Sequence, residues 1–285
     1  MNFVFLIALA AAWGVTFIFV RVAVADFSPI PLIFIRLTLA GLLLLPWVLP
    51  TGGIQFWRKK WRPIFGVSLF LMAVPFCLMA WASVVLSASM MSVLNATTPI
   101  MAALWAGILF KTRLTRLQTI GLSLGLLGVF VLASGQEQNL NATDIGLRTF
   151  AVLCATGCYG WSTHMSRVWL SDVPPVTLTC TSLLSSAVCL APFAAWLWPQ
   201  KPISPYAWSM AIGLAVISTA FAYAVFYHLN TVWGTTRTLT VTYLAPLFGM
   251  FSGVLLLGEK LTSQMLLGGV IIFSGVAMLT LRKRV

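Results

Sequence analysis

Polar and aromatic side chains recur inside the apolar stretches of this 285-residue sequence. Asn95, Thr98 and Trp105 are spaced so that they share one face of a helix. Arg36 is the basic residue that lies clearly inside an apolar run. A guanidinium binds a carboxylate, and aromatic rings hold an apolar side chain or, by a cation–π contact, an ammonium group. An amino acid carries all of these groups, so the pattern predicts a binding cavity for such a molecule.

Further aromatic, imidazole and hydroxyl groups in other apolar runs extend the candidate cavity. The candidate substrate-binding residues are Trp13, Arg36, Trp81, Asn95, Thr98, Trp105, Tyr159, Trp161, His164, Tyr223, Tyr227, His228 and Thr242. Pro99 and Pro246 lie in mid-run, where proline removes a backbone hydrogen bond, and are either hinges or fixed bends. Each of these residues also has an alternative interpretation. The small residues can serve helix packing, and the tryptophans can form a belt at the membrane interface. Arg36 can snorkel to the interface or brace the core.

Metal and cofactor chemistry is not expected. Cys154 and Cys158 lie four residues apart near His164, but no carboxylate or second histidine joins them, so helix packing is the expected role. The sequence has no Walker motif, which excludes direct use of ATP. Because no span interior holds a carboxylate, a proton relay would depend on His164 or His228, and facilitated diffusion or exchange is an equal alternative.

The composition determines which elements must position these groups. Charged residues make up 8% of the chain, against about a quarter in soluble domains. Hydrophobic residues make up 60%, and the mean hydropathy is +0.99. About 20 residues cross the hydrocarbon core as a helix, so the length allows ten spans with short loops and no soluble domain. The sequence predicts an all-α integral membrane protein with spans near residues 3–22, 30–49, 63–86, 88–110, 117–134, 146–168, 176–198, 206–229, 236–257 and 264–281.

The charge distribution orients these spans. With the N-terminus in the cytoplasm, twelve Lys and Arg residues fall in cytoplasmic segments and four on the opposite side. The positive-inside rule therefore predicts that both termini are cytoplasmic. The net charge of +12 reflects this topology and does not indicate a nucleic-acid partner.

The sequence repeats itself with a shift of about 146 residues. Arg21 and Asp26 align with Arg167 and Asp172, and with a shift of 147 Pro99 aligns with Pro246. This predicts a first five-helix repeat over 1–134, a linker over 135–145 and a second repeat over 146–285. Five spans are an odd number, so the second repeat must be inverted in the membrane, which is an architecture of transporters.

Several motifs resemble those of a known family. Trp13-Gly14 with Phe17, Tyr243-Leu244-Ala245-Pro246-Leu247 and Leu257-Gly258-Glu259-Lys260-Leu261 are similar to motifs of the EamA/RhaT type within the drug/metabolite transporter superfamily. Tyr243, within the second motif, joins the candidate substrate-binding residues. The first half departs from the pattern, because Lys111-Thr112-Arg113-Leu114 stands where the family often carries Gly-Glu-x-Leu. The drug-exporting relatives use a glutamate in their first span, which this chain lacks.

The resemblance implies a permease of the bacterial inner membrane that exports amino acids or related metabolites. We expect a monomer in membrane lipid with a small-molecule substrate, alternating access, and no cofactor or metal. Carriers for nucleotide sugars, sugar phosphates or cationic drugs are the alternatives that share the architecture. An intramembrane enzyme is the alternative from another class, and it would need clustered histidines or a nucleophile with its base.

Overall fold

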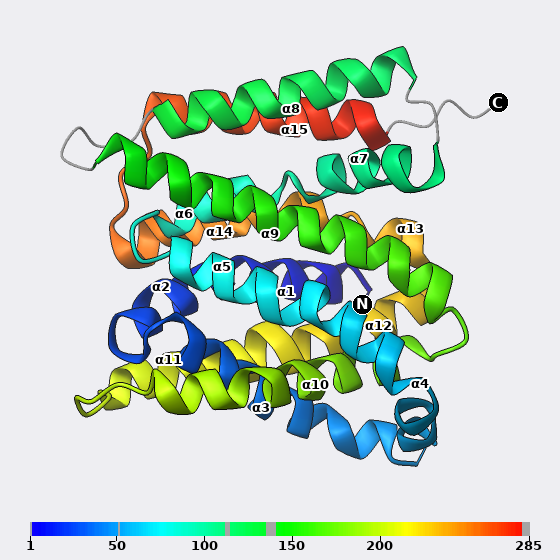
Figure 1. Cartoon of the computed structure of the whole chain (residues 1–285). Helices are drawn as coiled ribbons and strands as arrows, with labels where there is room; N and C mark the ends of the chain where they lie inside the picture. Colours follow the sequence, from blue (N-terminus) through cyan, green and yellow to red (C-terminus); the bar gives the residue numbers. More distant parts are fainter. Residues whose placement is uncertain (1, 51, 112–114, 135–140, 281–285) are drawn as a thin grey trace.

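The chain is all-helical in a computed structural model that describes residues 2–50, 52–111, 115–134 and 141–280 (Figure 1). The first half contains α1 (Asn2–Gly14), α2 (Thr16–Phe27), α3 (Pro29–Val48), α4 (Gly53–Ser68), η1 (Leu69–Ala73), α5 (Val74–Ala82), α6 (Ala88–Asn95), α7 (Thr98–Phe110) and α8 (Arg116–Ser134). The second half contains α9 (Ala142–Trp169), α10 (Pro175–Trp196), α11 (Pro205–Ala215), η2 (Val216–Phe221), α12 (Ala222–Trp233), α13 (Thr235–Thr238), α14 (Val241–Leu257) and α15 (Ser263–Thr280). The labels η1 and η2 mark short π-helices.

Several of these elements join end to end into longer helical segments. Within the described ranges, seven segments are long and apolar enough to cross a membrane. They are Asn2–Phe27, Pro29–Val48, Gly53–Ala82, Ala88–Phe110, Arg116–Ser134, Pro175–Trp196 and Pro205–Trp233. α14 and α15 are apolar but shorter, and α9 is 28 residues long with Asp144 and two arginines. The all-α class predicted from the sequence is therefore confirmed, and the described chain contains ten helical segments near the ten predicted ranges.

The largest difference from the predicted ranges concerns the third segment. The sequence predicts a span over 63–86, but the helix already begins at Gly53, after a left-handed Gly52 with φ of 72°. The basic run Arg58–Lys60 lies inside α4, and the helix kinks at Lys60 (φ −120°, ψ 28°). A charged run ends a membrane span but does not end a helix, because an amphipathic helix can continue at the membrane surface.

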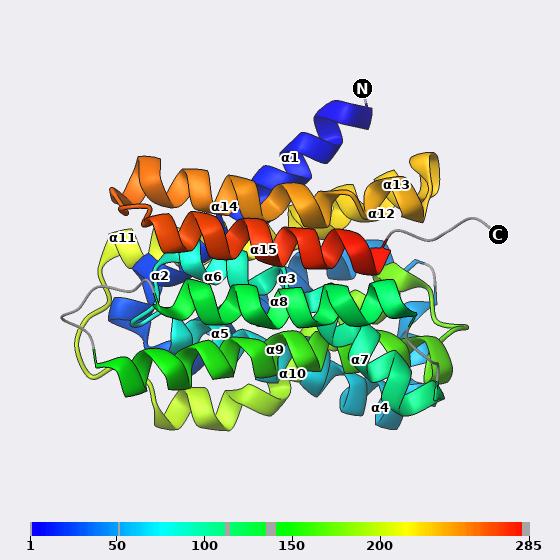
Figure 2. The same cartoon turned by 90° about the horizontal axis from the view of Figure 1, so that it is seen from above.

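Helix pairs pack through small residues. α8 and α15 lie side by side and form one face of the bundle (Figures 1 and 2). A Cβ atom added to Gly121 would lie 2.6 Å from the carbonyl oxygen of Gly275, and one added to Gly128 would lie 2.8 Å from that of Gly268. The two backbones therefore touch, as small residues permit in membrane helices.

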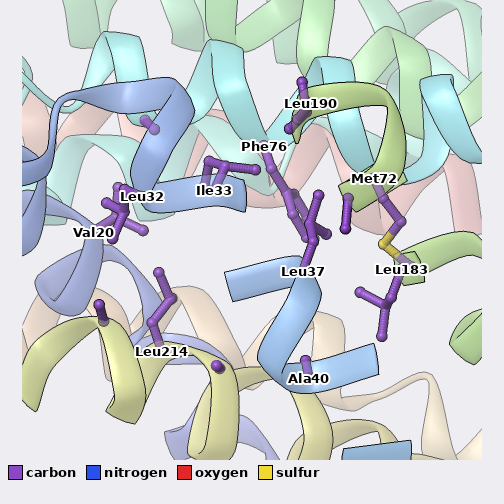
Figure 3. Close-up of a cluster of buried hydrophobic side chains, with 14 of the residues drawn as sticks. Val20, Leu32, Ile33, Leu37, Ala40, Met72, Phe76, Leu183, Leu190 and Leu214 are labelled. Atoms are coloured by element: carbon purple, nitrogen blue, oxygen red, sulfur yellow. The ribbon is translucent and has the colours of Figure 1, made fainter. Parts of the chain in front are cut away.

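The largest buried cluster surrounds α3. Leu32, Ile33 and Leu37 are fully buried and contact residues of α2, α5, α10 and α11 (Figure 3). The outer surface is also apolar, since Phe130 is 74% and Trp196 80% exposed. An apolar core inside an apolar surface is the pattern of a helix bundle surrounded by lipid.

Candidate substrate cavity

A cavity of about 270 Å³ lies among the helices of both halves. Its lining comes from α1, α2, α3, α5, α6, α7, α9, η2, α12 and α14. The candidate residues that line it are Trp13, Arg36, Asn95, Thr98, Tyr159, Tyr223 and Thr242, together with Pro99 and Pro246. Residues that lie far apart in the sequence therefore meet at one site.

Arg36 is the charged side chain of the described lining. It is 7% exposed, and its Nε donates a hydrogen bond of 3.0 Å to Oγ1 of Thr219. The guanidinium carbon lies 3.8 Å from the ring centroid of Phe76, which makes a cation–π contact. Neither partner carries a negative charge, so within the described chain this buried cation has no neutralising carboxylate.

The π-helix η2 positions the partner of Arg36. Thr219 donates its hydroxyl hydrogen to the carbonyl oxygen of Leu214 at 2.8 Å, five residues earlier. Because the hydrogen is used there, the oxygen is free to accept from Arg36. A π-helix inserts an extra residue into a turn and turns side chains to new directions, often at functional sites. The neighbouring Ser218 also lines the cavity and donates to the carbonyl oxygen of Ala12 at 2.7 Å.

Two aromatic pairs form walls of the cavity. The rings of Trp13 and Tyr223 lie 6.3 Å apart at 75°, and those of Phe76 and Tyr159 lie 6.3 Å apart at 67°. Both are edge-to-face contacts, the arrangement that aromatic pairs prefer. Each pair joins helices that are distant in sequence, α1 with α12 and α5 with α9.

The polar part of the lining comes from the fourth and ninth segments. The hydroxyls of Thr98 and Thr242 donate to carbonyl oxygens three residues earlier, each at 2.7 Å. Their oxygens can therefore still accept a hydrogen bond from a ligand. Asn95, at the end of α6, lies beside them in the lining.

The two candidate hinges differ in structure. The fourth segment is interrupted between α6 and α7, and Pro99 follows this break in the first turn of α7. α14 instead continues through Pro246, whose carbonyl oxygen accepts a 3.2 Å hydrogen bond from Ser92. Proline is tolerated in a first turn, whereas inside a helix it removes a hydrogen bond.

Some candidate residues tie helices together outside this cavity. Trp105 donates from Nε1 to the carbonyl oxygen of Gly157 at 2.9 Å. His164 makes a 2.9 Å hydrogen bond from Nε2 to the carbonyl oxygen of Ala102. Both contacts join α7 to α9.

Other candidates lie further from the cavity. The ring of Trp81 lies 4.4 Å below the guanidinium carbon of Arg148, and Trp161 packs edge-on against Phe70 and Trp169. Exposed His228 contacts the ring of Phe5.

Two tyrosines pack behind or beside the lining. Tyr227 stacks on Tyr223 with ring centroids 6.1 Å apart, and its hydroxyl shares a hydrogen bond with Thr179. Tyr243 is half-buried against a hydrophobic cluster that includes Leu94 and Ala155. Tyr223 lines the cavity, whereas Tyr227 and Tyr243 do not.

Several lining residues were not among the candidates. They are Thr16, Phe17, Val20, Phe76, Met79, Met91, Ser92, Ala96, Ser218 and Ala245. Phe76 could have been found from the repeat, because a shift of 147 residues aligns it with the candidate Tyr223. The apolar members had no signal that separates a cavity wall from helix packing.

The lining can bind a ligand with an anionic end and an apolar or aromatic end. Arg36 supplies hydrogen-bond donors and charge, and the four rings supply apolar surface. No group of three or more His, Cys, Asp or Glu residues in the described part of the chain could hold a metal ion.

Comparison with known proteins shows which proteins this chain is similar to. The sequence profile of the EamA-like transporter family matches residues 2–134 and, a second time, residues 148–281. An uncharacterized transporter of Archaeoglobus fulgidus is 24% identical, with 95% of each chain covered. The uncharacterized inner membrane transporter YedA of Escherichia coli K12 is 27% identical, with 98% of this chain and 90% of YedA covered.

A relative with a named activity and a solved structure extend the comparison. A protein of Salmonella typhimurium named as a probable amino-acid metabolite efflux pump is 26% identical, with 93% of this chain and 89% of that protein covered. A protein of known crystal structure shares the fold with a TM-score of 0.69 at 17% identity, over 98% of this chain and 96% of that one. The two profile matches span nearly the whole sequence. The chain therefore belongs to the EamA-like transporter family and is an integral membrane transporter.

Proposed function

We propose that this transporter exports small amphipathic metabolites, foremost amino acids with aromatic or hydrophobic side chains, across the bacterial inner membrane. The main support for this proposal is that Arg36 is a buried cation in an aromatic-walled cavity whose described lining contains no carboxylate. The named activity of the Salmonella relative agrees with this substrate class.

The electrostatics of Arg36 favour a carboxylate ligand. Removing a charge from water costs several kcal/mol unless a partner compensates it, and Thr219 and Phe76 are neutral. A carboxylate fits the planar guanidinium with two parallel hydrogen bonds and supplies the missing charge. The remaining surface of Trp13, Tyr159 and Tyr223 can hold an apolar side chain, and their rings attract an ammonium group.

Size and charge argue against the other substrate classes. Pockets for small molecules measure about 300–1,000 Å³, and this cavity of about 270 Å³ lies just below that range. It suits one small metabolite better than a nucleotide sugar. A sugar phosphate carries two negative charges at neutral pH and calls for more cations than one arginine. A cationic drug would be repelled by Arg36. The relatives named as transporters speak against the intramembrane enzyme.

We propose further that the two halves are inverted repeats with ten spans in total. Trp13 aligns with Tyr159 under a shift of 146, and Phe76 with Tyr223 under a shift of 147. The wall pairs Trp13–Tyr223 and Tyr159–Phe76 are thus equivalent, and both have centroids 6.3 Å apart. The π-helices η1 and η2 also begin 147 residues apart. The double profile match supports the same division into residues 1–134 and 146–285.

The two ends of the cavity differ, as alternating access requires. At one end α6 packs on α14, with Ser92 donating its hydroxyl hydrogen to the carbonyl oxygen of Pro246 at 3.2 Å and Ser89 donating its hydroxyl hydrogen to Glu259 at 2.6 Å. Glu259 closes this end by accepting from the backbone nitrogens of Ala88 at 2.7 Å and Ser89 at 2.9 Å. The corresponding pair at the other end, α7 with α13, shows no comparable packing in the described chain.

We therefore propose that this conformation is open toward the end that carries α13. The α14–α15 connection with Glu259 lies at the opposite end of the bundle (Figure 1). The bias of twelve basic residues against four supports a cytoplasmic location for the α13 end and for both termini. The structure would then be the inward-facing state, ready to take substrate from the cytoplasm.

Counterflow in proteoliposomes tests the function. Vesicles containing the purified protein are preloaded with one unlabelled compound and exposed to its labelled form. We expect uptake with aromatic and hydrophobic amino acids and none with nucleotide sugars, sugar phosphates or cationic drugs. Uptake of a cationic drug without uptake of amino acids would refute the proposed substrate class.

A further inference from the structure

The basic beginning of α4 takes no part in the cavity. Arg58, Lys59 and Arg62 are exposed, and none has an ion-pair partner in the described chain. Lys60, by contrast, is neutralised by a salt bridge to Asp172. This hydrogen bond lowers the pKa of Asp172, so its carboxylate is charged at neutral pH. Three uncompensated cations therefore remain on one short segment.

A kink divides this segment, so that Arg58 and Lys59 precede it and Arg62 follows it. The kink at Lys60 changes the direction of the chain between Gly53–Lys59 and the continuing helix. α4 lies at an edge of the bundle in both views (Figures 1 and 2). Its inner side packs on α9 and α10 through Ile64 and Val67. The exposed cations are thus held at the rim of the bundle by a buried apolar anchor.

A groove runs between α4 and α10 beside these cations. Trp57, Trp61 and Phe65, four residues apart, line it together with Ser185 and Val188. Its volume is about 110 Å³. Trp61 is 54% and Val188 67% exposed, so the groove opens to the outside of the bundle, where a membrane protein meets lipid.

Arg62 connects the cations to the groove. The guanidinium carbon of Arg62 lies 5.4 Å from the ring centroid of Trp61, which lines the groove. Tryptophan prefers the boundary between hydrocarbon and headgroups. Basic residues beside a groove between membrane helices are a recurring arrangement for lipid headgroups.

We infer that this surface binds one anionic phospholipid. Part of one acyl chain lies in the groove against Trp57, Trp61 and Val188, and the phosphate contacts Arg58, Lys59 and Arg62. The groove fits an apolar chain and the cations fit an anion, and a phospholipid carries both groups. A soluble phosphate would leave the groove unfilled, and an acidic protein segment would not reach into the bilayer. The inference is independent of the transported substrate.

Native mass spectrometry of the full chain tests this inference. The detergent-purified protein is incubated with equal amounts of phosphatidylglycerol and phosphatidylcholine that carry identical acyl chains, and bound lipid is counted. We expect a preference for phosphatidylglycerol in the wild type. Each cation near an anionic lipid contributes about fivefold, so the double variant Arg58→Gln with Arg62→Gln should lose about 25-fold of it.

Matched variants separate the two halves of the surface. Arg116→Gln removes an exposed arginine at the start of α8, at the opposite edge of the bundle, and should keep the preference. Val188→Trp fills the groove and should weaken the binding of both lipids, whereas Val168→Trp, at another exposed valine, should not.

Three results would overturn the inference. One is equal binding of the two lipids by the wild type. The second is an unchanged preference in the double arginine variant. The third is competition by glycerol phosphate as effective as that by phosphatidylglycerol, which would mean that the anion binds without its acyl chains.

Discussion

The guanidinium carbon of Arg36 lies over the ring of Phe76, 3.8 Å from its centroid, and Nε of Arg36 donates a hydrogen bond to Thr219. Phe76 in turn meets Tyr159 edge-on. One cation is thereby held between elements of both halves of the chain, α3 and α5 on one side and η2 and α9 on the other. The position of this charge depends on how the two halves pack.

Removing the hydroxyl of Thr219 should destabilise the protein. In Thr219→Val the Nε–H of Arg36 loses its acceptor while it remains buried, which costs about 1–3 kcal/mol. Thr219→Ser keeps the oxygen and is the matched control. Thermal unfolding in detergent should show a lower melting temperature for the valine variant alone. Equal melting temperatures for all three proteins would mean that this hydrogen bond does not hold Arg36.

Glu259 should act as a latch on the end of the cavity closed by α6. Glu259→Gln weakens three charge-assisted hydrogen bonds to the first turn of α6, each worth about 1.5–3 kcal/mol. We expect the population to shift toward opening at this end by tenfold or more. The readout is the labelling rate of a Met91→Cys probe, in a background without the five native cysteines, by a membrane-impermeant thiol reagent on the extracytoplasmic side.

The control for this experiment is another acidic residue of the second half. Asp144→Asn removes the salt bridge to Arg148, and among the described residues no hydrogen bond or ion pair joins Asp144 to α6. Its labelling rate should equal that of the wild type. A glutamine variant that labels no faster than the wild type would exclude a latch at Glu259.

Equivalent glycines of the two halves should respond alike to substitution. A Cβ atom on Gly14 would lie 2.8 Å from the backbone nitrogen of Gly249, and one on Gly160 would lie 2.8 Å from that of Ala102. Backbone atoms cannot move aside as side chains can, so Gly14→Ala and Gly160→Ala should each cost about 1–3 kcal/mol. Gly157→Ala, which meets open space, is the control.

The measurement is again the melting temperature in detergent. Both tight variants should melt lower than the wild type by a similar amount, and Gly157→Ala should not. If Gly14→Ala were harmless while Gly160→Ala destabilised the protein, the two contacts would not be equivalent, and the proposed repeat would lose a main support.

The helical architecture could be predicted from composition because apolar runs of about 20 residues have few other folds. The beginning of α4 could not be predicted, because the charged residues Arg58 and Lys59 are typical of a loop. The structure shows that this stretch is helical and that α4 packs on α10. The π-helix at Val216–Phe221, which aims Thr219 at Arg36, has no signature in residue type.

The cavity could be predicted only in part. Asn95 and Thr98 were assigned to it from their helical face, and the structure brings both to its wall. Trp105 shares that face in sequence, yet the break between α6 and α7 turns it toward Gly157 of α9. Periodicity identifies residues on one face of a continuous helix, and it fails across a break.

Binding of an amino acid and its amide by wild type and Arg36→Ala tests the central claim most directly. The amide keeps the side chain and the ammonium group and lacks the carboxylate. The wild type should bind the amino acid at least about 30-fold more tightly than the amide, since losing one partner of a buried charge pair costs 2 kcal/mol or more. Arg36→Ala should bind both equally weakly. A wild type that binds the two ligands alike would contradict a carboxylate at Arg36.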